Sequence, residues 1–154
     1  QRSCTMVEFH ANPQASAEAI DRQGWLHTGD LGTMDSRGYV RVTGRVKEMI
    51  IRGGENMFPA EIENVLLEHP SVLEVAVVGL PDVKWGESWA CFVHAATVEA
   101  IEPQDLHTHG RQNMSPQKTP ALWFQIEAFP LTGSGKIRKF ELRDRYLAGE
   151  YESL

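Results

Sequence analysis

The chain has 154 residues, of which 42% are hydrophobic and 23% are charged, so it can form one domain, or one small domain and part of another. Its net charge of −6 argues against a general binder of nucleic acids or anionic membranes. No stretch approaches the roughly 18 apolar residues that a membrane span needs. Cys4 and Cys91 lie far apart and form no disulfide or metal-ligand pattern, which favours a reducing, cytoplasmic setting.

The first part of the chain predicts short elements. The opening residues include neither an initiator Met nor a signal sequence, and we expect a fragment whose N-terminal part is missing. Residues 13–22 predict a helix, and the turn formers of 24–32 predict a loop. Alternation over 38–44 predicts a strand, and residues 46–51 predict a second one.

The middle of the chain gives the clearest pattern. Pro59 suits the first position of a helix, acidic residues follow it, and Pro70 ends the helix. Residues 72–78 are almost continuously apolar, which predicts a strand buried on both faces. Residues 80–82 and 85–87 predict turns.

The remaining segments complete a small domain. They are a strand over 89–95, a weak helix over 103–111, a loop over 112–120, a strand over 122–129, a flexible loop over 131–136 and a helix over 137–147. From residue 45 the order β–α–β–β–α–β–α predicts an α+β fold with a mixed sheet and flanking helices.

Asp30 is a first candidate site residue, at the end of the glycine-flanked run GWLHTGD (24–30). A carboxylate held in such a run can accept two hydrogen bonds from a vicinal diol, such as that of a ribose. The alternative is that Asp30 only caps a turn.

The run GRVKEMIIRGGENMFPAEIE (44–63) is a second candidate. Arg45 and Lys47 precede a short strand, and arginine can hold a phosphate or a ribose in a fixed geometry. Gly53 and Gly54 follow, and their missing Cβ atoms let another molecule approach the backbone. The alternative is a solvated basic strand edge, which discourages sheet aggregation.

Lys136 is a third candidate, in the run TGSGK (132–136). A lysine on a mobile glycine loop can swing onto developing negative charge. The run fails as a P-loop, because Pro130 stands where the first glycine is needed and Ile137 where a Ser or Thr would hold Mg²⁺. The alternative is an exposed lysine in a linker.

No metal site is predicted. His107 and His109 are two residues apart, so on a helix they would not share a face. Cys91 lies in an apolar strand and is expected to be inert core.

Three runs in this order resemble the last motifs of the AMP-forming acyl-CoA synthetases, in the adenylate-forming superfamily. They are GWLHTGDLG (24–32), GRVKEMIIRGGENMFPAEIE (44–63) and LTGSGKIRKFELR (131–143). The resemblance runs from about Met6 to Leu147, and the GGEN and PAEIE runs are most similar to fatty-acyl or medium-chain acyl-CoA synthetases.

The resemblance implies a division into three parts. Residues 1–44 would be a short β-rich end of a larger N-terminal adenylation domain, residues 45–47 the hinge, and residues 48–154 the C-terminal lid domain. Lys47 would be the residue about which the lid domain rotates.

The resemblance also implies nucleotide-binding roles. Asp30 would bind the ribose hydroxyls of ATP and of the acyl-adenylate, and Arg45 would also contact the nucleotide.

The remaining implied roles concern catalysis and the thiol acceptor. Lys136 would be the catalytic lysine, bridging the substrate carboxylate and the α-phosphate. Gly53, Gly54 and Glu55 would line the tunnel for the pantetheine arm of CoA.

The chemistry that the resemblance implies has two steps. A carboxylic acid, of the fatty-acid type, and ATP give acyl-AMP and pyrophosphate, and the thiol of CoA then displaces AMP. Mg²⁺ would be bound mainly by the missing N-terminal domain. That domain would also carry the phosphate loop and the acyl pocket, so the isolated chain is expected to lack ligase activity. Two alternatives stay open: an adenylation domain that loads a carrier protein, and a detached, non-catalytic lid or interaction module.

Overall fold

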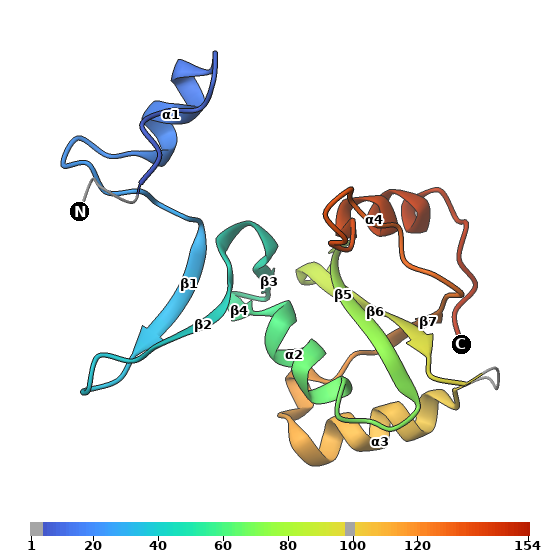
Figure 1. Ribbon diagram of the computed structural model, residues 1–154. Helices are drawn as coiled ribbons and strands as arrows, with labels where there is room; N and C mark the ends of the chain where they lie inside the picture. The colour runs from blue at the N-terminus through green and yellow to red at the C-terminus, as the bar shows by residue number, and fades with distance from the viewer. Residues whose placement is uncertain (1–4, 98–100) are drawn as a thin grey trace.

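The computed structural model describes residues 5–97 and 101–154 (Figure 1). The first elements are α1 (Pro13–Ala19), β1 (Asp30–Met34), β2 (Val40–Arg45), the 3₁₀ helix η2 (Val46–Glu48), β3 (Ile50–Arg52), β4 (Glu55–Met57) and α2 (Pro59–Leu66). They are followed by β5 (Val72–Asp82), β6 (Gly86–Ala95), α3 (Pro103–Asn113), the 3₁₀ helix η3 (Pro116–Lys118), β7 (Leu122–Gln125) and α4 (Lys139–Leu147).

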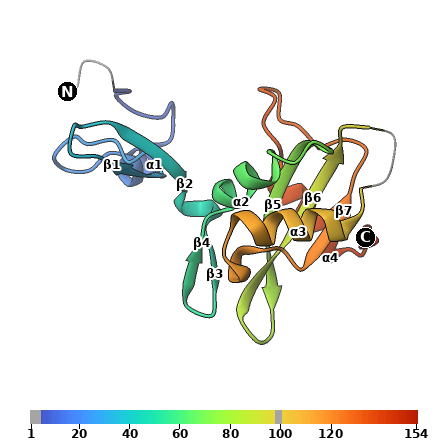
Figure 2. The same ribbon diagram turned by 90° about the horizontal axis from the view of Figure 1, so that it is seen from below.

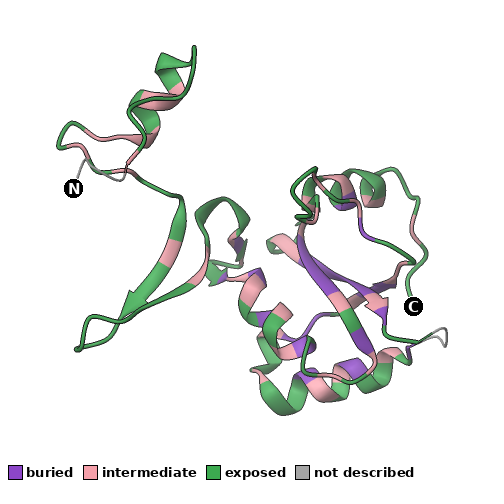
Figure 3. Cartoon of the chain, in the orientation of Figure 1, coloured by how far each residue is buried: buried purple, intermediate pink, exposed green. Residues whose placement is uncertain are grey.

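Strands β1 and β2 form a two-stranded antiparallel sheet that stands away from the remainder of the molecule (Figure 1). Its register pairs Asp30 with Arg45 and Met34 with Val40. None of the described residues from 5 to 49 is buried (Figure 3). This part of the chain therefore has no hydrophobic core of its own.

The main sheet has the order β4-β3-β6-β5, and β7 also pairs with β6. β5 and β6 form a long antiparallel hairpin, from Val72 opposite Ala95 to Asp82 opposite Gly86. β7 runs parallel to β6, because the chain passes through α3 before it returns to the sheet. The predicted α+β fold with a mixed sheet is confirmed.

Helices cover both faces of the main sheet. Val75 and Val77 of β5 lie in a core cluster with residues of α2 and α3, whereas Ala76 and Val78 lie in a second cluster with Leu142 of α4. A strand covered on both faces needs apolar side chains at successive positions. The predicted buried strand is therefore confirmed, and Figure 3 shows the burial concentrated there.

Several predicted boundaries in the sheets are wrong. β1 already begins at Asp30, inside the predicted loop, since Asp30 pairs with Arg45. The predicted turns at 80–82 and 85–87 fall largely inside β5 and β6. Pro81 is tolerated there because β5 is an edge strand of the main sheet.

The predicted strand over 46–51 is also wrong in its first half. Residues 46–48 form η2, and the strand β3 begins only at Ile50. The sequence analysis missed β4, which pairs with β3 across Gly53 and Gly54 (Figure 2). A strand of three residues is too short to show a period-2 pattern.

Other predicted elements are present with different ends. The helix predicted over 13–22 ends at Ala19, α3 runs to Asn113, the strand predicted over 122–129 ends at Gln125, and the final helix begins at Lys139 rather than at 137.

Candidate functional site

Asp30 and Arg45 meet through antiparallel pairing. They are direct partners in the register of β1 and β2, and Arg45 Nε lies 2.9 Å from Asp30 Oδ1. The two side chains are 32% and 55% exposed, so the pair is open to solvent. An exposed carboxylate beside a guanidinium offers hydrogen-bond acceptors and donors at one point. Such a pair can engage a diol or a phosphate.

The segment after this pair is a single tight turn around Lys47. Val46 N–H donates to Gly29 O at 2.9 Å, and Met49 N–H donates to Val46 O at 3.3 Å. The Lys47 side chain is exposed and has no hydrogen bond or ion pair with another residue in the described part of the chain.

Gly53 and Gly54 form the turn between β3 and β4, and both have positive φ values, +56° and +89°. A Cβ on Gly53 would lie 3.0 Å from Cε3 of Trp85, whereas a Cβ on Gly54 meets no atom within 4 Å. The open space predicted beside both glycines is therefore found only at Gly54. Glu55, the next residue, is exposed at the start of β4.

Trp85 is held in place by Arg52. The Arg52 guanidinium lies 4.9 Å from the centre of the Trp85 ring and 5.2 Å from that of Trp89, so it contacts both indoles. Cation–π contacts of this kind stabilise a packed arrangement by about 0.5–2 kcal/mol. Trp85 was predicted in a turn, and no pattern in the sequence connects it with Gly53.

The Lys136 segment is a closed hairpin rather than the predicted flexible loop. Leu131 and Ile137 form a β-bridge, and Thr132 N–H donates to Lys136 O at 2.8 Å. The Lys136 N–H in turn donates to Thr132 Oγ1 at 3.0 Å. Gly135 has a φ of +79°, which the tight turn requires. The backbone at Lys136 is thus held by hydrogen bonds within its own hairpin.

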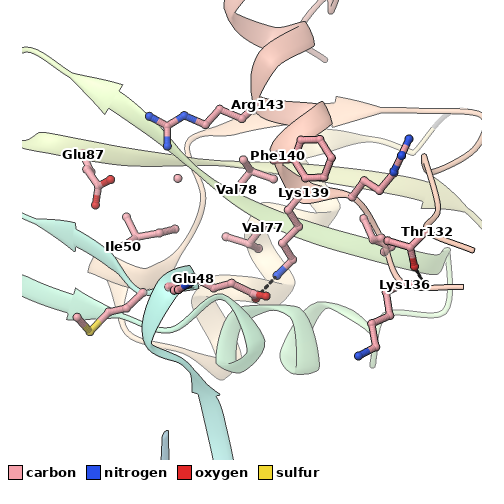
Figure 4. Close-up of a pocket in the computed structure, with 15 residues that line it drawn as sticks. Glu48, Ile50, Val77, Val78, Glu87, Thr132, Lys136, Lys139, Phe140 and Arg143 are labelled. Atoms are coloured by element: carbon pink, nitrogen blue, oxygen red, sulfur yellow. Dashed lines mark hydrogen bonds and ion pairs between the residues drawn. The ribbon is translucent and has the colours of Figure 1, made fainter. Parts of the chain in front are cut away.

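Lys47 and Lys136 line the same groove, of about 430 Å³ (Figure 4). Neither Asp30 nor Gly54 is among the described residues that line it. The structure therefore separates the candidate residues into three places. These are the Asp30–Arg45 pair, the groove with Lys47 and Lys136, and the Gly53–Gly54 turn.

The groove has an excess of cationic side chains, which favours binding of an anion. Its charged lining residues are Lys47, Lys136, Arg138, Lys139 and Arg143, with Glu48 and Glu87.

A group of ion pairs at this groove was missed by the sequence analysis. Lys139 Nζ lies 3.1 Å from Glu48 Oε2 and 2.7 Å from Glu63 Oε1, and the same Glu63 oxygen accepts from Val77 N–H at 2.7 Å. We call Glu48, Lys139 and Glu63 the hinge clamp. No local pattern could have revealed it, because 91 positions separate Lys139 from Glu48.

Other types of site find little support. Burial, and to a lesser extent the nearby Glu63, raise the pKa of the Cys91 thiol well above its usual value, so Cys91 is inert core as predicted. Within residues 5–97 and 101–154, no group of three His, Cys, Asp or Glu side chains is placed to hold a metal ion. No helix in the same residues is long and apolar enough to cross a membrane.

Comparison with known proteins decides the family. Residues 61–136 match the family model described as the AMP-binding enzyme C-terminal domain. The chain carries this AMP-binding C-terminal domain. The resemblance to the adenylate-forming enzymes is thereby confirmed.

Relatives of this AMP-binding C-terminal domain extend the likeness beyond the matched residues. The fatty acid–[acyl-carrier-protein] ligase ScoC of Streptomyces coeruleorubidus is 47% identical over 92% of the chain and 27% of its own length. The long-chain-fatty-acid–CoA ligase FadD13 of Mycobacterium tuberculosis is 45% identical over 93% of the chain and 28% of its own length. The chain thus spans about a quarter of these relatives.

A solved structure shows the same arrangement of elements. It is the o-succinylbenzoate CoA synthetase MenE of Bacillus subtilis, in complex with the acyl-adenylate intermediate OSB-AMP. It matches with a TM-score of 0.84 and 34% identity, over 91% of this chain and 28% of that protein.

Proposed function

We propose that the chain is the C-terminal part of an AMP-forming acyl-CoA synthetase, which activates a carboxylic acid of the fatty-acid type. The observation that carries the proposal is Lys136, held beside the bridge that closes its hairpin and lining the same groove as Lys47. Several relatives are named acyl-CoA synthetases or fatty-acid ligases, which supports the substrate class. The setting that we propose is the cytoplasm.

The proposed reaction divides the candidate residues between two steps. In the first step the carboxylate attacks the α-phosphorus of ATP and pyrophosphate leaves, and the Lys136 ammonium stabilises the negative charge that develops. Asp30 and Arg45 hold the nucleotide through its ribose and phosphate. In the second step the thiol of CoA displaces AMP, with its pantetheine arm passing Gly54 and Glu55.

The two steps use different faces of the C-terminal domain, so we propose a rotation between them. Residues 1–44 belong to the end of the adenylation domain, residues 45–47 are the hinge, and residues 48–154 are the lid domain. Asp30 stays with the first part and Arg45 stays paired with it at the start of the hinge, whereas Lys136 moves away before the thiol enters. Mg²⁺ is assigned to the rest of the enzyme, as the resemblance implies.

The test uses the complete enzyme that contains this chain. Lys136→Ala should lower the rate of adenylate formation by about 10²- to 10³-fold, since one charge-stabilising group is removed. Thioester formation from preformed acyl-AMP should be retained. Lys118→Ala is the control, because Lys118 is a half-buried lysine that pairs with Glu61 and does not line the groove.

Equal loss of both half-reactions in Lys136→Ala would contradict the assignment. The purified 154-residue chain should form no acyl-CoA by itself, and measurable formation would overturn the proposed dependence on a larger domain.

A second candidate differs only in the acceptor. The 47% identity to an enzyme named as a fatty acid–[acyl-carrier-protein] ligase favours a holo-carrier protein as the thiol. Incubation of the enzyme and acyl-AMP with CoA or with a holo-carrier protein separates the two, because only the true acceptor should be acylated at a substantial rate. A detached, non-catalytic module is less favoured, since a scaffold has no need for Asp30, Arg45, Lys47 and Lys136 together.

A further inference from the structure

The backbone is anchored on both sides of Lys47. Upstream, Val46 N–H donates to Gly29 O at 2.9 Å, which attaches the turn to the segment before β1. Downstream, Glu48 Oε2 lies 3.1 Å from Lys139 Nζ, which attaches the turn to the start of α4. Lys47 is exposed and makes no polar side-chain contact within the described residues. The rotation proposed above would therefore fall at Lys47, between the two anchors.

The downstream anchor is itself fixed to the main sheet. Lys139 Nζ also contacts Glu63 Oε1 at 2.7 Å, and that oxygen accepts from Val77 N–H of β5. The Lys139 and Glu63 side chains are 23% and 16% exposed, so solvent screens this contact less than an ordinary surface pair. The hinge clamp thus connects η2, α4, α2 and β5 through one ammonium group.

The clamp gives the hinge a direct connection to Lys136. Along the chain, the path from Glu48 to Lys136 runs through every strand of the main sheet. Through the clamp, Glu48 contacts Lys139, which follows Lys136 by three residues, just after the bridge that closes its hairpin. Figure 4 shows Lys139 reaching Glu48 while the Lys136 side chain extends away from both.

We propose that Glu48 and Lys139 are positioning residues that fix Lys136 relative to the hinge, so that rotation at Lys47 moves Lys136 as part of one rigid lever. The effect on catalysis rests on the function proposed above, whereas the effect on the hinge turn does not. Without the clamp, the turn could open and close without a corresponding movement of Lys136.

The hinge turn can be tested on the chain itself. The Met49 amide bonds Val46 O across Lys47, so its hydrogen exchange reports opening of the turn. Glu48→Gln should speed that exchange about threefold, the effect expected for one partly exposed ion pair. Glu48→Gln leaves Lys139 paired with Glu63, so the Val77 amide should remain as protected as in the parent chain.

Further variants make this first test specific. Lys139→Met should speed exchange of the Met49 amide at least as much as Glu48→Gln does. Lys139→Arg keeps the positive charge, so its Met49 amide should exchange as slowly as in the parent chain. Lys118→Met, which removes an ion pair to Glu61 elsewhere on α2, should leave that exchange unchanged. The proposed anchor between Glu48 and Lys139 would be overturned if Glu48→Gln changed neither the exchange rate of the Met49 amide nor the thermal midpoint of unfolding.

The lever is tested in the complete enzyme. Glu48→Gln and Lys139→Met should lower kcat for adenylate formation by about tenfold, because small misplacement of a catalytic group is costly. KM for the acid should stay the same, and Lys139→Arg should keep most of the rate.

The outcomes separate the two proposals. If Lys136→Ala abolishes adenylate formation but Glu48→Gln and Lys139→Met do not slow it, the lever is overturned and the proposed function stands. If Lys136→Ala has no effect, the proposed function and the catalytic part of the lever both fail. The exchange of Met49 alone then decides whether the clamp holds the hinge turn.

Discussion

Gly38 and Gly54 have the same φ of +89°, and a Cβ on either meets no atom within 4 Å. Replacing either glycine by alanine should therefore lower the free energy of unfolding by about 1 kcal/mol, because of backbone strain and without a steric clash. In the complete enzyme only Gly54→Ala should slow the thiol-dependent step, because only Gly54 lies on the proposed acceptor face. The measurements are the free energy of unfolding of both variants and the rates of both half-reactions.

Gly53→Ala is the informative comparison for this prediction. Its Cβ would meet Trp85, so tryptophan fluorescence should change in Gly53→Ala and not in Gly54→Ala. A Gly38→Ala enzyme that lost the thiol step as fully as Gly54→Ala would contradict the assignment.

Asp35 gives a prediction for the dependence of stability on pH. Its Oδ1 accepts from Tyr39 N–H at 3.0 Å and from Arg37 N–H at 2.9 Å, and Arg37 Nη2 lies 2.9 Å from Oδ2. The Tyr39 N–H, and then the Arg37 guanidinium, lower the pKa of Asp35 below 3.8. A lowered folded-state pKa stabilises the β1–β2 turn above about pH 4, and this stabilisation is lost as the pH falls through the folded-state pKa.

The Asp35 prediction is checked by NMR titration of the carboxyl, with exchange of the Tyr39 amide as a second measure. Asp35→Asn, which cannot titrate, should remove the pH dependence of that exchange between about pH 5 and pH 2. A measured pKa at or above 3.8 would show that the turn does not hold the carboxylate.

At the residue scale, the sequence indicated the types of group at the site better than their surroundings. Asp30 and Arg45 were assigned to one nucleotide, and pairing of β1 and β2 does bring them together. Gly53 could not be told from Gly54, because only the fold places Trp85 against one of them. Lys139 was passed over because its partners come from distant parts of the chain.

At the scale of elements, prediction succeeded where burial imposes a strong pattern. β5 was recognised from its continuous apolar run, and α2 from its proline and acidic start. Prediction failed at η2 and β4, where three residues follow a local turn rather than a periodic pattern. The closed Lys136 hairpin was not predicted for the same reason, because its cross-strand hydrogen bonds leave no apolar period in the sequence.

For the molecule as a whole, the buried side chains that stabilise the fold are distributed unevenly along the chain. None of the described residues from 5 to 49 is buried, whereas both core clusters lie in the part built on the main sheet. Apolar side chains on the β1–β2 sheet are also strongly exposed, among them Met34 at 71% and Val42 at 66%. Such a surface favours contact with another protein part, and we propose that this is the preceding domain of the enzyme.

Limited proteolysis of the isolated chain should therefore begin before the main sheet. Trypsin should cut first at the basic residues of 5–47, because local unfolding there costs little free energy. A product that begins near residue 48 should persist, as measured by mass spectrometry. Early cuts within β5, β6 or α3 would contradict this division, and the complete enzyme should resist cleavage at Arg37 and Arg41.

The parallel pairing of β7 with β6 has a consequence for the order of folding. β5 and β6 are joined by a short turn, so they can pair early with little loss of loop entropy. β7 can pair only after the chain has closed a long loop through α3, and such non-local contacts form slowly. Lys136 lies between β7 and α4, so it reaches its position among the last steps. A newly made chain would therefore pair β5 with β6 before its proposed catalytic group is in place.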